Sequence, residues 1–474
     1  MRDIVRAVSR RLRAARASLI LALVGACAGD DEADTGASES GATTSGGTTG
    51  AASGATTTSG GASESGTTGT GTDTSAGTSA ATTSTGGDTD TTTGGALDDE
   101  AILRMAIAGE IDPADALATV ADSGGLPVLT KDGTFLFACL CGPGGWSLIG
   151  DHNAWAPAPM GQSGPLWWIE ADVPAPDGSR YKFKPDAGDD VADPYGRRYS
   201  YDQFGEISFV RASAPHLERW YAYAGFGLGP RDLQVWVPQD GAFTHMLFAH
   251  DGQNLFDPAG IGGGWKLQKV VPPEMLIVGI DNTGVARMDE YTHVEDDIGG
   301  GELYGGKGDA YADLVEMTIR PRMEAAYGEA AVVGTMGSSL GGLIAFHIGH
   351  RFPERYDMVI SLSGTMGWGS IGLQNPTMME LYEGAGKRPF AVYLDSGGSD
   401  GGSPCVDADA DGTMDDDPDA SDNYCENLQM RDLLESLGWA FDVDLWHWWE
   451  QGAPHNEVAW AARVDYPLGL FADL

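Results

Sequence analysis

Two adjacent serines lie in Gly337-Ser338-Ser339-Leu340-Gly341, between an apolar, β-branched stretch and an apolar stretch with helical periodicity. The spacing G-x-S-x-G at a strand-to-helix junction is that of a nucleophile elbow, whose middle serine adopts strained dihedral angles. The flanking glycines remove Cβ atoms that would collide across so sharp a turn. The pattern predicts Ser339 as a nucleophile and gives Ser338 no chemical role. The N–H of Leu340, which opens the helix, is predicted to face a developing oxyanion.

A serine hydroxyl is a weak nucleophile unless a general base takes its proton. Of the nine histidines, His455 in "EQGAPHNEVAW" follows the last expected strand and precedes the last expected helix. That is where the elbow order of serine, acid and histidine places the base. The acid should follow the strand "FAVYLDSG". Asp400 in "SGGSD" is the preferred residue, and Asp395 is the second candidate because it lies in the strand or at its tip.

A second oxyanion donor is expected from the loop after an earlier strand. The segment "HDGQNLF" at 250–256 fits this position. Gly252 would allow the backbone to approach closely, which makes the N–H of Gln253 the best candidate. The alternative is an ordinary glycine turn.

The elements that would position these residues alternate between apolar strands and helices. Strands are predicted at 232–238, 245–252, 274–282, 330–337, 357–364, 390–397 and 441–449. Helices are predicted at 308–327, 340–351, 424–437 and 457–472. This alternation predicts an α/β fold with a mostly parallel sheet covered on both faces, and such sheets hold their sites at the carboxyl ends of the strands.

The residues before this α/β part have a different pattern of apolar and polar side chains. Residues 97–125 have helical periodicity, with Pro113 opening a second short helix, and form a predicted helical preface. Residues 126–213 alternate polar and apolar side chains in short runs separated by turns, which predicts a small β-sandwich.

The segment 126–213 resembles the early-set, immunoglobulin-like β-sandwich found ahead of glycogen-branching and related enzymes. The residues that match its pattern are Gly150, Asp151, Asn153, Trp155, Trp167, Tyr181, Lys182, Phe183, Asp193 and Pro194, with His152 in the place of a phenylalanine. Trp155 and Trp167 are candidates for stacking on a sugar, but packing in the sandwich core is the more common fate of such tryptophans.

Residues 214–474 resemble the putative-esterase family, which includes enterochelin esterases, feruloyl and acetyl-xylan esterases and esterase D-type enzymes. The resemblance is carried in order by "FAHDGQNLFD", "IVGIDNTGVARMDEYT", "GSSLGGLIAF" and "GAPHNEVAWAARV". It implies an α/β-hydrolase fold and hydrolysis of carboxylic esters through a Ser-His-Asp triad and a covalent acyl-enzyme, without a catalytic cofactor. Ser339 and His455 match the family's residues, and Asp400 satisfies its Gly-x-x-Asp/Glu pattern. Several members also carry an N-terminal early-set sandwich.

The resemblance leaves the substrate open among feruloyl or acetyl esters of carbohydrates, siderophore esters and simple acyl esters. Two other functions stay open as well. The same serine would serve an acyltransferase, as in the related mycolyl-transferases, and the sandwich would serve a surface carbohydrate-binding protein without catalysis.

Sequence patterns in the N-terminal 96 residues predict that the protein is exported from the cytoplasm. Residues 1–27 combine a basic front with a short apolar run, as in a signal peptide, and the small residues before Cys27 resemble a bacterial lipobox, whose cysteine is lipidated. The alternative is ordinary signal cleavage near 26–28. Residues 28–96 are almost entirely Gly, Ser, Thr, Ala and Asp, which predicts a disordered tether. The expected location is therefore the cell envelope or surface, on a lipid anchor. The net charge of −41 argues against nucleic acid as a partner.

An acidic insertion, "CVDADADGTMDDDPDASDNYC", follows the expected catalytic acid. In it Asp407, Asp409, Asp411 and Asp415 follow the spacing of a calcium loop, although Pro418 occupies the position of the usual closing carboxylate. A structural Ca²⁺ is therefore one interpretation and a solvated acidic loop the other. Cys405 and Cys425, which bracket the insertion, are expected to form a disulfide. Cys139 and Cys141 are expected not to bond each other, because they are only two residues apart in a strand-like run.

Overall fold

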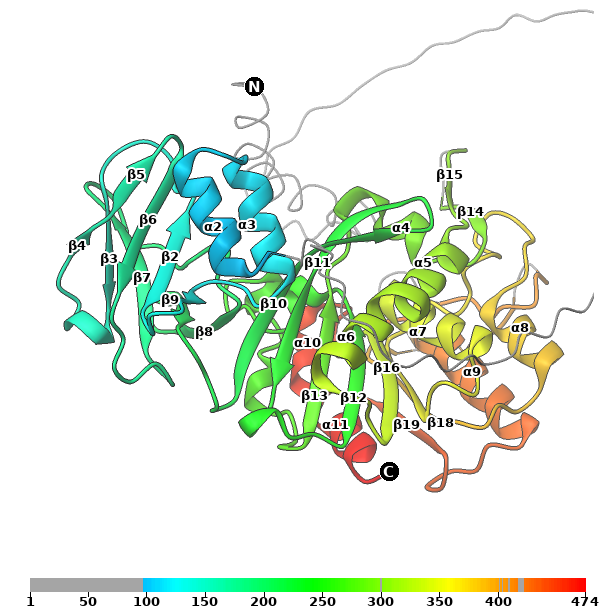
Figure 1. Ribbon diagram of the computed structural model, residues 1–474. Helices are drawn as coiled ribbons and strands as arrows, with labels where there is room; N and C mark the ends of the chain where they lie inside the picture. The colour runs from blue at the N-terminus through cyan, green and yellow to red at the C-terminus, as the bar shows by residue number, and fades with distance from the viewer. Residues whose placement is uncertain (1–96, 299–300, 400, 403, 408–409, 417–421) are drawn as a thin grey trace, which may run out of the picture. The chain divides into compact units, whose positions relative to one another are not determined.

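A mixed sheet of 13 strands runs through the residues that the computed structural model describes, which are 97–298, 301–399, 401–402, 404–407, 410–416 and 422–474 (Figure 1). Its order is β19 (Leu445–Trp449), β18 (Ala391–Ser396), β17 (Met358–Leu362), β16 (Val332–Ser338), β12 (His245–His250), β13 (Met275–Ile280), β11 (Leu228–Val237), β10 (His216–Gly225), β8 (Arg198–Asp202), β9 (Gly205–Phe209), β7 (Arg180–Pro185), β3 (Trp146–Gly150) and β4 (Ala158–Pro159). The strands from β19 to β13 are parallel, and those from β11 to β4 are antiparallel to their neighbours.

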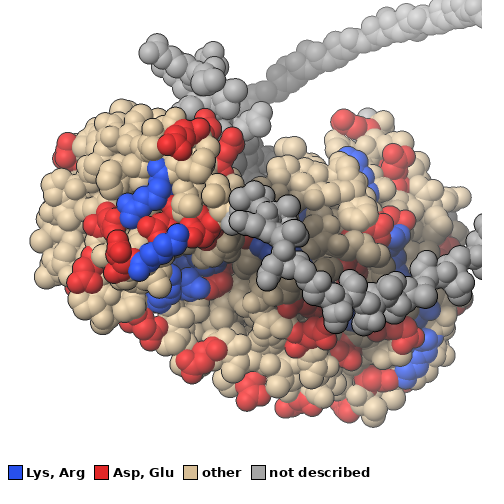
Figure 2. Space-filling model, in the orientation of Figure 1, with Lys and Arg blue, Asp and Glu red and all other residues tan. Residues whose placement is uncertain are grey.

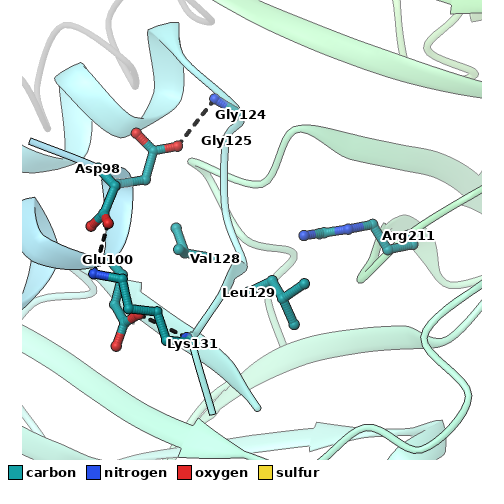
Figure 3. Close-up of a pocket in the computed structure, with 9 residues that line it drawn as sticks. Asp98, Glu100, Gly124, Gly125, Val128, Leu129, Lys131 and Arg211 are labelled. Atoms are coloured by element: carbon teal, nitrogen blue, oxygen red, sulfur yellow. Dashed lines mark hydrogen bonds and ion pairs between the residues drawn. The ribbon is translucent and has the colours of Figure 1, made fainter. Parts of the chain in front are cut away.

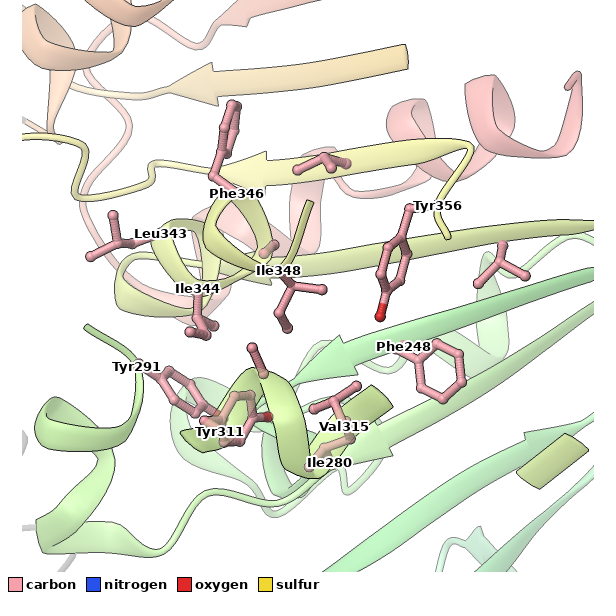
Figure 4. Close-up of a cluster of buried hydrophobic side chains, with 14 of the residues drawn as sticks. Phe248, Ile280, Tyr291, Tyr311, Val315, Leu343, Ile344, Phe346, Ile348 and Tyr356 are labelled. Atoms are coloured by element: carbon pink, nitrogen blue, oxygen red, sulfur yellow. The ribbon is translucent and has the colours of Figure 1, made fainter. Parts of the chain in front are cut away.

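Helices cover both faces of the parallel half, which confirms the predicted α/β architecture. Strands such as β13 are buried along their whole length, and this explains their unbroken apolar sequences. One face packs against α5 (Gly308–Leu314), the π-helical segment η7 (Val315–Ile319), α6 (Arg320–Tyr327), α7 (Leu340–Arg351), α8 (Met378–Ala385) and α9 (Tyr424–Leu437). The other face packs against α10 (Glu457–Arg463) and α11 (Asp465–Ala472). Figure 4 shows part of the first core, which brings together Phe248 of β12, Val315 of η7 and side chains of α7 such as Ile344 and Ile348.

The helical preface consists of α2 (Asp99–Ala108) and α3 (Pro113–Asp122). Each helix begins at an aspartate whose carboxylate accepts a backbone N–H of the first turn. Asp98 accepts from Ala101 at 2.8 Å, and Asp112 accepts from Ala114 at 2.8 Å. Buried leucine and alanine side chains of both helices pack against β2 (Phe135–Cys139) and β6 (Leu166–Ala171).

A second, four-stranded sheet lies between the preface and the antiparallel end of the large sheet. Its order is β1 (Val128–Leu129), β2, β6 and β5 (Gly161–Ser163). Phe137 of β2 and Trp167 of β6 share a buried core with Tyr181 and Phe183 of β7, so the two sheets pack face to face. The large sheet continues through the boundary expected at residue 213, because β10 pairs with both β8 and β11.

Carboxylate side chains are spread over the face shown in Figure 2, with Lys and Arg side chains lying among them. On this described face the basic side chains do not merge into one patch. None of the described helices is both long and apolar enough to cross a membrane.

Candidate active site

The segment around Ser339 forms a sharp turn between β16 and α7. Ser339 has φ 57° and ψ −126° and is the N-cap residue of α7. A Cβ at Gly337 would overlap the backbone of Gly341, so glycine is required where the chain reverses. Ser339 is half-buried, whereas Ser338 is buried at the end of β16. This is the geometry that the G-x-S-x-G spacing predicts.

Hydrogen bonds from the neighbouring strand hold the strained serine in place. The N–H of Ser339 donates to the carbonyl of Leu362, the last residue of β17, at 2.9 Å. The carbonyl of Ser339 accepts the N–H of Thr365 at 3.3 Å and that of Leu343 at 3.1 Å. A positive φ in a non-glycine residue costs on the order of 1–3 kcal/mol, and contacts of this kind offset it.

His455 lies in the loop between β19 and α10, where the sequence places it. Its Nδ1 is 2.5 Å from Oδ1 of Asp422, and the ring meets the Trp460 ring edge-on at 4.9 Å between centroids. About a fifth of the histidine side chain is exposed, whereas the aspartate side chain is completely buried. When Nδ1–H donates to a carboxylate, Nε2 is left to exchange protons with a substrate or a nucleophile.

Asp422 just precedes α9 and is held from several sides. Its Oδ2 accepts the hydroxyl of Ser363 and the N–H of Gly397, each at 2.6 Å, and lies 3.3 Å from Nη2 of Arg463. These donors fix the carboxylate while Oδ1 faces His455. Asp400, the acid expected from sequence, lies outside the described residues.

Asp395, the second candidate for the acid, has other partners. Both of its oxygens accept the guanidinium of Arg463, at 2.9 and 3.0 Å, and they also accept the Ser363 N–H and the Tyr393 hydroxyl. Burial raises the pKa of Asp395 above its ordinary value, although the facing Arg463 opposes the rise. Asp395 therefore braces the residues around Asp422.

The two expected oxyanion donors lie at the carboxyl ends of neighbouring parallel strands. Leu340 follows the elbow after β16, and Gln253 lies in the 3₁₀ turn η3 (Gly252–Asn254) after β12. A Cβ at Gly252 would overlap the backbone of Gly279 in β13, so this turn packs directly on the sheet. The side-chain oxygen of Gln253 accepts the N–H of Asn282 at 3.1 Å. The fold thus brings both residues to the same edge of the sheet.

Asp251, Asn282 and Arg287 form a polar cluster beside the elbow. The sequence analysis quoted the segments that contain these residues but assigned them no function. The carboxylate of Asp251 accepts Nε and Nη2 of Arg287 at 2.8 and 2.7 Å, and Nδ2 of Asn282 at 2.6 Å. Burial alone would raise the pKa of Asp251, but the Arg287 guanidinium outweighs it and lowers that pKa. A Cβ at Gly341 would be 3.2 Å from this carboxylate. The cluster therefore supports both η3 and the first turn of α7. The preference of a buried carboxylate for arginine is the signal that could have paired these motifs.

Two disulfides are present in the described residues. Cys405 and Cys425 are bonded, with Cα atoms 5.5 Å apart, and so join the insertion to α9. Cys139 and Cys141 are also bonded, with Cα atoms 5.2 Å apart, so the expectation that they would not bond is wrong. The chain leaves β2 at Cys139, and beyond that point the backbone is free of the strand geometry on which the expectation was based.

The acidic insertion forms a turn around its first aspartate. Asp407 accepts the N–H groups of Asp411 and Gly412, each at 3.0 Å. Asp409, one of the four expected ligands, lies outside the described residues. Among the residues that are described, no three His, Cys, Asp or Glu side chains are grouped as a metal ion would require.

Trp167 and Trp155 of the expected sandwich differ in exposure. Trp167 is 8 % exposed in the shared core, and its indole N–H donates to the carbonyl of Gly142 at 2.9 Å. Trp155 is half-buried, and its indole N–H donates to Asp151 at 2.9 Å. Of the two, Trp167 is therefore a packing residue. The Tyr181 hydroxyl donates to the buried Asp193 at 2.8 Å.

Comparisons with known proteins found one family model and several solved structures that are similar to this chain. Residues 229–413 match the family model described as "Putative esterase". The chain is similar in structure to the enterobactin esterase FES of Shigella flexneri, with 14% identity, TM-score 0.38 and coverage of 72% of this chain and 93% of that one. It is also similar to an IroE-like serine hydrolase of Shewanella oneidensis (18% identity, TM-score 0.42, 54% and 80% covered). A third similar structure is the siderophore hydrolase EstB of Aspergillus nidulans (17%, 0.37, 54% and 94%). No curated protein matches the chain.

Proposed function

Since residues 229–413 match the putative-esterase family model, we propose that this chain is a serine esterase and that Ser339, His455 and Asp422 form its catalytic triad. Ser339 and His455 are the residues expected from sequence. The acid assignment moves from Asp400 to Asp422, because Asp422 is the carboxylate in contact with His455.

The main support for the triad is a set of hydrogen bonds at the carboxyl end of β17, to Leu362 and Ser363. The N–H of Ser339 donates to Leu362, and the hydroxyl of the next residue, Ser363, donates to Asp422. The Trp460 indole, whose ring packs on His455, also donates to that hydroxyl at 3.0 Å. Nucleophile, base and acid are therefore anchored to the same two residues at the carboxyl end of one strand.

The reaction then follows from the roles of these groups. Ser339 Oγ attacks the ester carbonyl while Nε2 of His455 takes its proton, and Asp422 stabilises the imidazolium through Nδ1–H. The N–H groups of Leu340 and Gln253 bind the oxyanion. His455 protonates the leaving alkoxide, and water activated by the same imidazole releases the acid from the acyl-enzyme.

A panel of four variants tests the triad by turnover of a short nitrophenyl ester. Ser339→Ala should lower kcat on the order of 10⁵–10⁶-fold, because the nucleophile is lost. Asp422→Asn should lower it on the order of 10³–10⁴-fold, because the amide no longer holds the required imidazole tautomer. Ser338→Ala and Asp400→Asn are the matched controls and should keep activity within a few-fold. A large loss in Asp400→Asn with activity retained in Asp422→Asn would contradict the acid assignment.

We propose that the substrates are exported or extracellular esters, either feruloyl or acetyl esters of carbohydrates or siderophore esters. The support is the export signal expected at 1–27, the tether expected at 28–96 and the lipobox-like Cys27, all of which lie outside the described residues. The protein would then be a lipoprotein at the cell envelope or surface. Turnover of methyl ferulate, acetylated xylan and a catecholate trilactone by the purified chain distinguishes these classes. Metabolic labelling with a fatty acid tests the anchor: the protein should incorporate the label, and the Cys27→Ala variant should not.

Two further proposals concern the parts around the esterase. We propose that 126–213 is an early-set sandwich, supported by its two face-to-face sheets and by the shared core of Trp167, Tyr181 and Phe183. We also propose that the insertion binds a structural Ca²⁺ through Asp407, Asp409, Asp411 and Asp415, supported by the spacing of these carboxylates.

A further inference from the structure

A cavity of about 430 Å³ lies between α3, β10 and the π-helical segment η7, and it contains none of the residues of the catalytic machinery. Its lining includes Tyr195 and Tyr221, which are half-buried, and Tyr223, which is 8 % exposed. Its volume is in the range of small-molecule sites, which are typically lined by apolar and aromatic groups with a few polar ones. We call it the tyrosine cavity.

A β-bulge shapes one wall of the tyrosine cavity. The pairing of β10 with β11 shifts between Trp220 and Tyr223, and Ala222 has φ 62°. The carboxylate of Asp232 on β11 accepts the N–H of Ala222 at 2.9 Å and fixes this conformation. In a regular strand only alternate residues face one side, whereas here four consecutive residues, 221–224, line the cavity. The small residue Ala222 therefore lines the cavity between Tyr221 and Tyr223.

The opposite wall is irregular as well. Thr318 lies in η7, where the long helix expected at 308–327 makes a π-helical turn. Such turns cost stability and recur at functional sites. A bulge and a π turn thus meet at one cavity, whose lining includes none of the proposed catalytic residues.

The polar groups of the cavity carry no unbalanced charge. The rings of Tyr195 and Tyr221 are 6.2 Å apart and inclined by 44°, and the Tyr221 hydroxyl donates to the carbonyl of Pro194. The Tyr223 hydroxyl is 3.5 Å from Asp122 Oδ1, and that carboxylate lies 3.6 Å from the Arg322 guanidinium. Aromatic faces combined with neutral or paired polar groups suit a ligand that has both C–H faces and hydroxyls.

A second cavity of the N-terminal part provides a contrast (Figure 3). It has a volume of about 320 Å³, and most of its charged groups already have partners: Asp99 accepts the N–H of Gly124, and Arg211 donates to the carbonyl of Pro127. Lys131 Nζ is 2.8 Å from Asp98, and the Lys131 N–H donates to Glu100 at 2.9 Å. These pairs join α2 to the second sheet and leave little for a ligand.

We propose that the tyrosine cavity binds a neutral saccharide, at a site separate from the catalytic serine. A sugar ring would lie against the half-buried rings of Tyr195 and Tyr221, and its hydroxyls would bond with Thr318 and the Asp122 carboxylate. The inference does not rest on the esterase reaction, because it concerns binding alone.

Titration calorimetry on the full chain carrying Ser339→Ala tests the proposal, with xylohexaose, cellohexaose and mannohexaose as probes and free ferulic acid as the competing aromatic class. We expect at least one hexasaccharide to bind. Tyr221→Ala should weaken that binding about tenfold, because it removes one aromatic contact. Ala118→Trp, which fills the cavity from the exposed side of α3, should abolish binding without lowering Tm. Tyr466→Ala removes a tyrosine that is 43 % exposed on α11, and it should leave binding unchanged.

Three results would overturn the proposal. One is the absence of hexasaccharide binding by a chain whose Ser339-containing form still hydrolyses a nitrophenyl ester. Another is saccharide binding that neither Tyr221→Ala nor Ala118→Trp weakens. The third is binding of ferulic acid, but of no saccharide, that Ala118→Trp removes. Loss of esterase activity in the Ser339→Ala panel bears on the triad and leaves these outcomes unaffected.

Discussion

His250 shows how a buried ionisable residue couples this fold to pH. It ends β12, is 1 % exposed, and its ring nitrogens lie 2.9 Å from the Tyr311 hydroxyl and 3.1 Å from the Thr335 hydroxyl. Burial lowers the pKa of His250 to about 3, with the neighbouring Asp251 opposing and Arg287 reinforcing this shift. The imidazole is therefore neutral in the native protein at all but strongly acidic pH.

From this we predict acid sensitivity with a definite sign. Unfolded histidine has a pKa of about 6.5, so below that pH the unfolded chain takes up a proton that the native His250 does not accept until about pH 3. The stabilising effect is complete above pH 6.5 and decreases as the pH falls, by at most about 1.4 kcal/mol per pH unit.

In His250→Gln, which keeps hydrogen-bonding groups, unfolding by urea should show a weaker pH dependence between about pH 6.5 and 4. Burial also lowers the pKa values of His293, His350 and His447, each to about 4, so part of the dependence should persist in the variant. An unchanged slope in His250→Gln would show that His250 does not contribute.

The three residues of the proposed triad differ in how far the sequence could predict them. Ser339 and His455 are marked by local signals, a glycine-flanked turn and a loop between the last strand and the last helix. Asp422 is separated from β18 by an insertion, and its approach to His455 depends on how that insertion folds back. Residues 397–400 already satisfy the Gly-x-x-Asp/Glu pattern, and Asp400 is closer to β18 along the chain than Asp422 is. The sequence therefore favoured Asp400. Only the packing around Ser363 identifies Asp422 as the partner.

At the level of elements, agreement between sequence and structure follows the strength of the local pattern. The helix expected at 424–437 is α9 with the same bounds, and the strand expected at 330–337 is β16 within one or two residues at each end. The strand β10 was not expected, because its sequence lacks β-branched residues and is interrupted by a bulge in which Ala222 has a positive φ. The π turn η7 was also missed, since no sequence period distinguishes it from α-helix.

The insertion between β18 and α9 is predicted to bind Ca²⁺, and this binding can be tested through the stability of the chain. If Asp407, Asp409, Asp411 and Asp415 bind Ca²⁺, the ion should stabilise the native state by mass action, by about 2.7 kcal/mol at a hundredfold excess over Kd. Tm of the chain should then fall on dialysis against EDTA and recover with Ca²⁺ on the order of 1 mM, the range of extracellular sites. Asp407→Ala should remove the response, whereas Asp432→Ala, on the surface of α9, should keep it. A Tm that is indifferent to both EDTA and Ca²⁺ favours the solvated acidic loop.

Across the whole molecule, one arginine joins parts that the sequence treats as separate. Arg197, which directly precedes β8, is 2 % exposed. Its guanidinium donates to the carbonyls of Ala121 and Ser123 at the end of α3, at 2.5 and 3.0 Å, and to Arg219 on β10 at 2.6 Å. The guanidinium also lies 3.6 Å from the centroid of the Trp220 ring. This one side chain thus bonds both the end of the preface and the large sheet, a connection between distant segments that no local pattern could predict.

Replacing this arginine should therefore loosen the helical preface more than the esterase. Arg197→Met fills a similar volume but removes the guanidinium donor from the carbonyls of Ala121, Ser123 and Arg219, which should lower the free energy of unfolding by about 2–4 kcal/mol. Arg197→Lys should lie between Arg197→Met and the unchanged protein, because an ammonium lacks the planar fork that reaches several acceptors and stacks on Trp220. Urea unfolding measures the loss, and protease cleavage in α2 and α3 should become faster while turnover of a nitrophenyl ester at low temperature is kept. Equal unfolding curves for Arg197→Met and the unchanged chain would mean that the preface is held by its apolar contacts with β2 and β6, and that the guanidinium adds nothing to them.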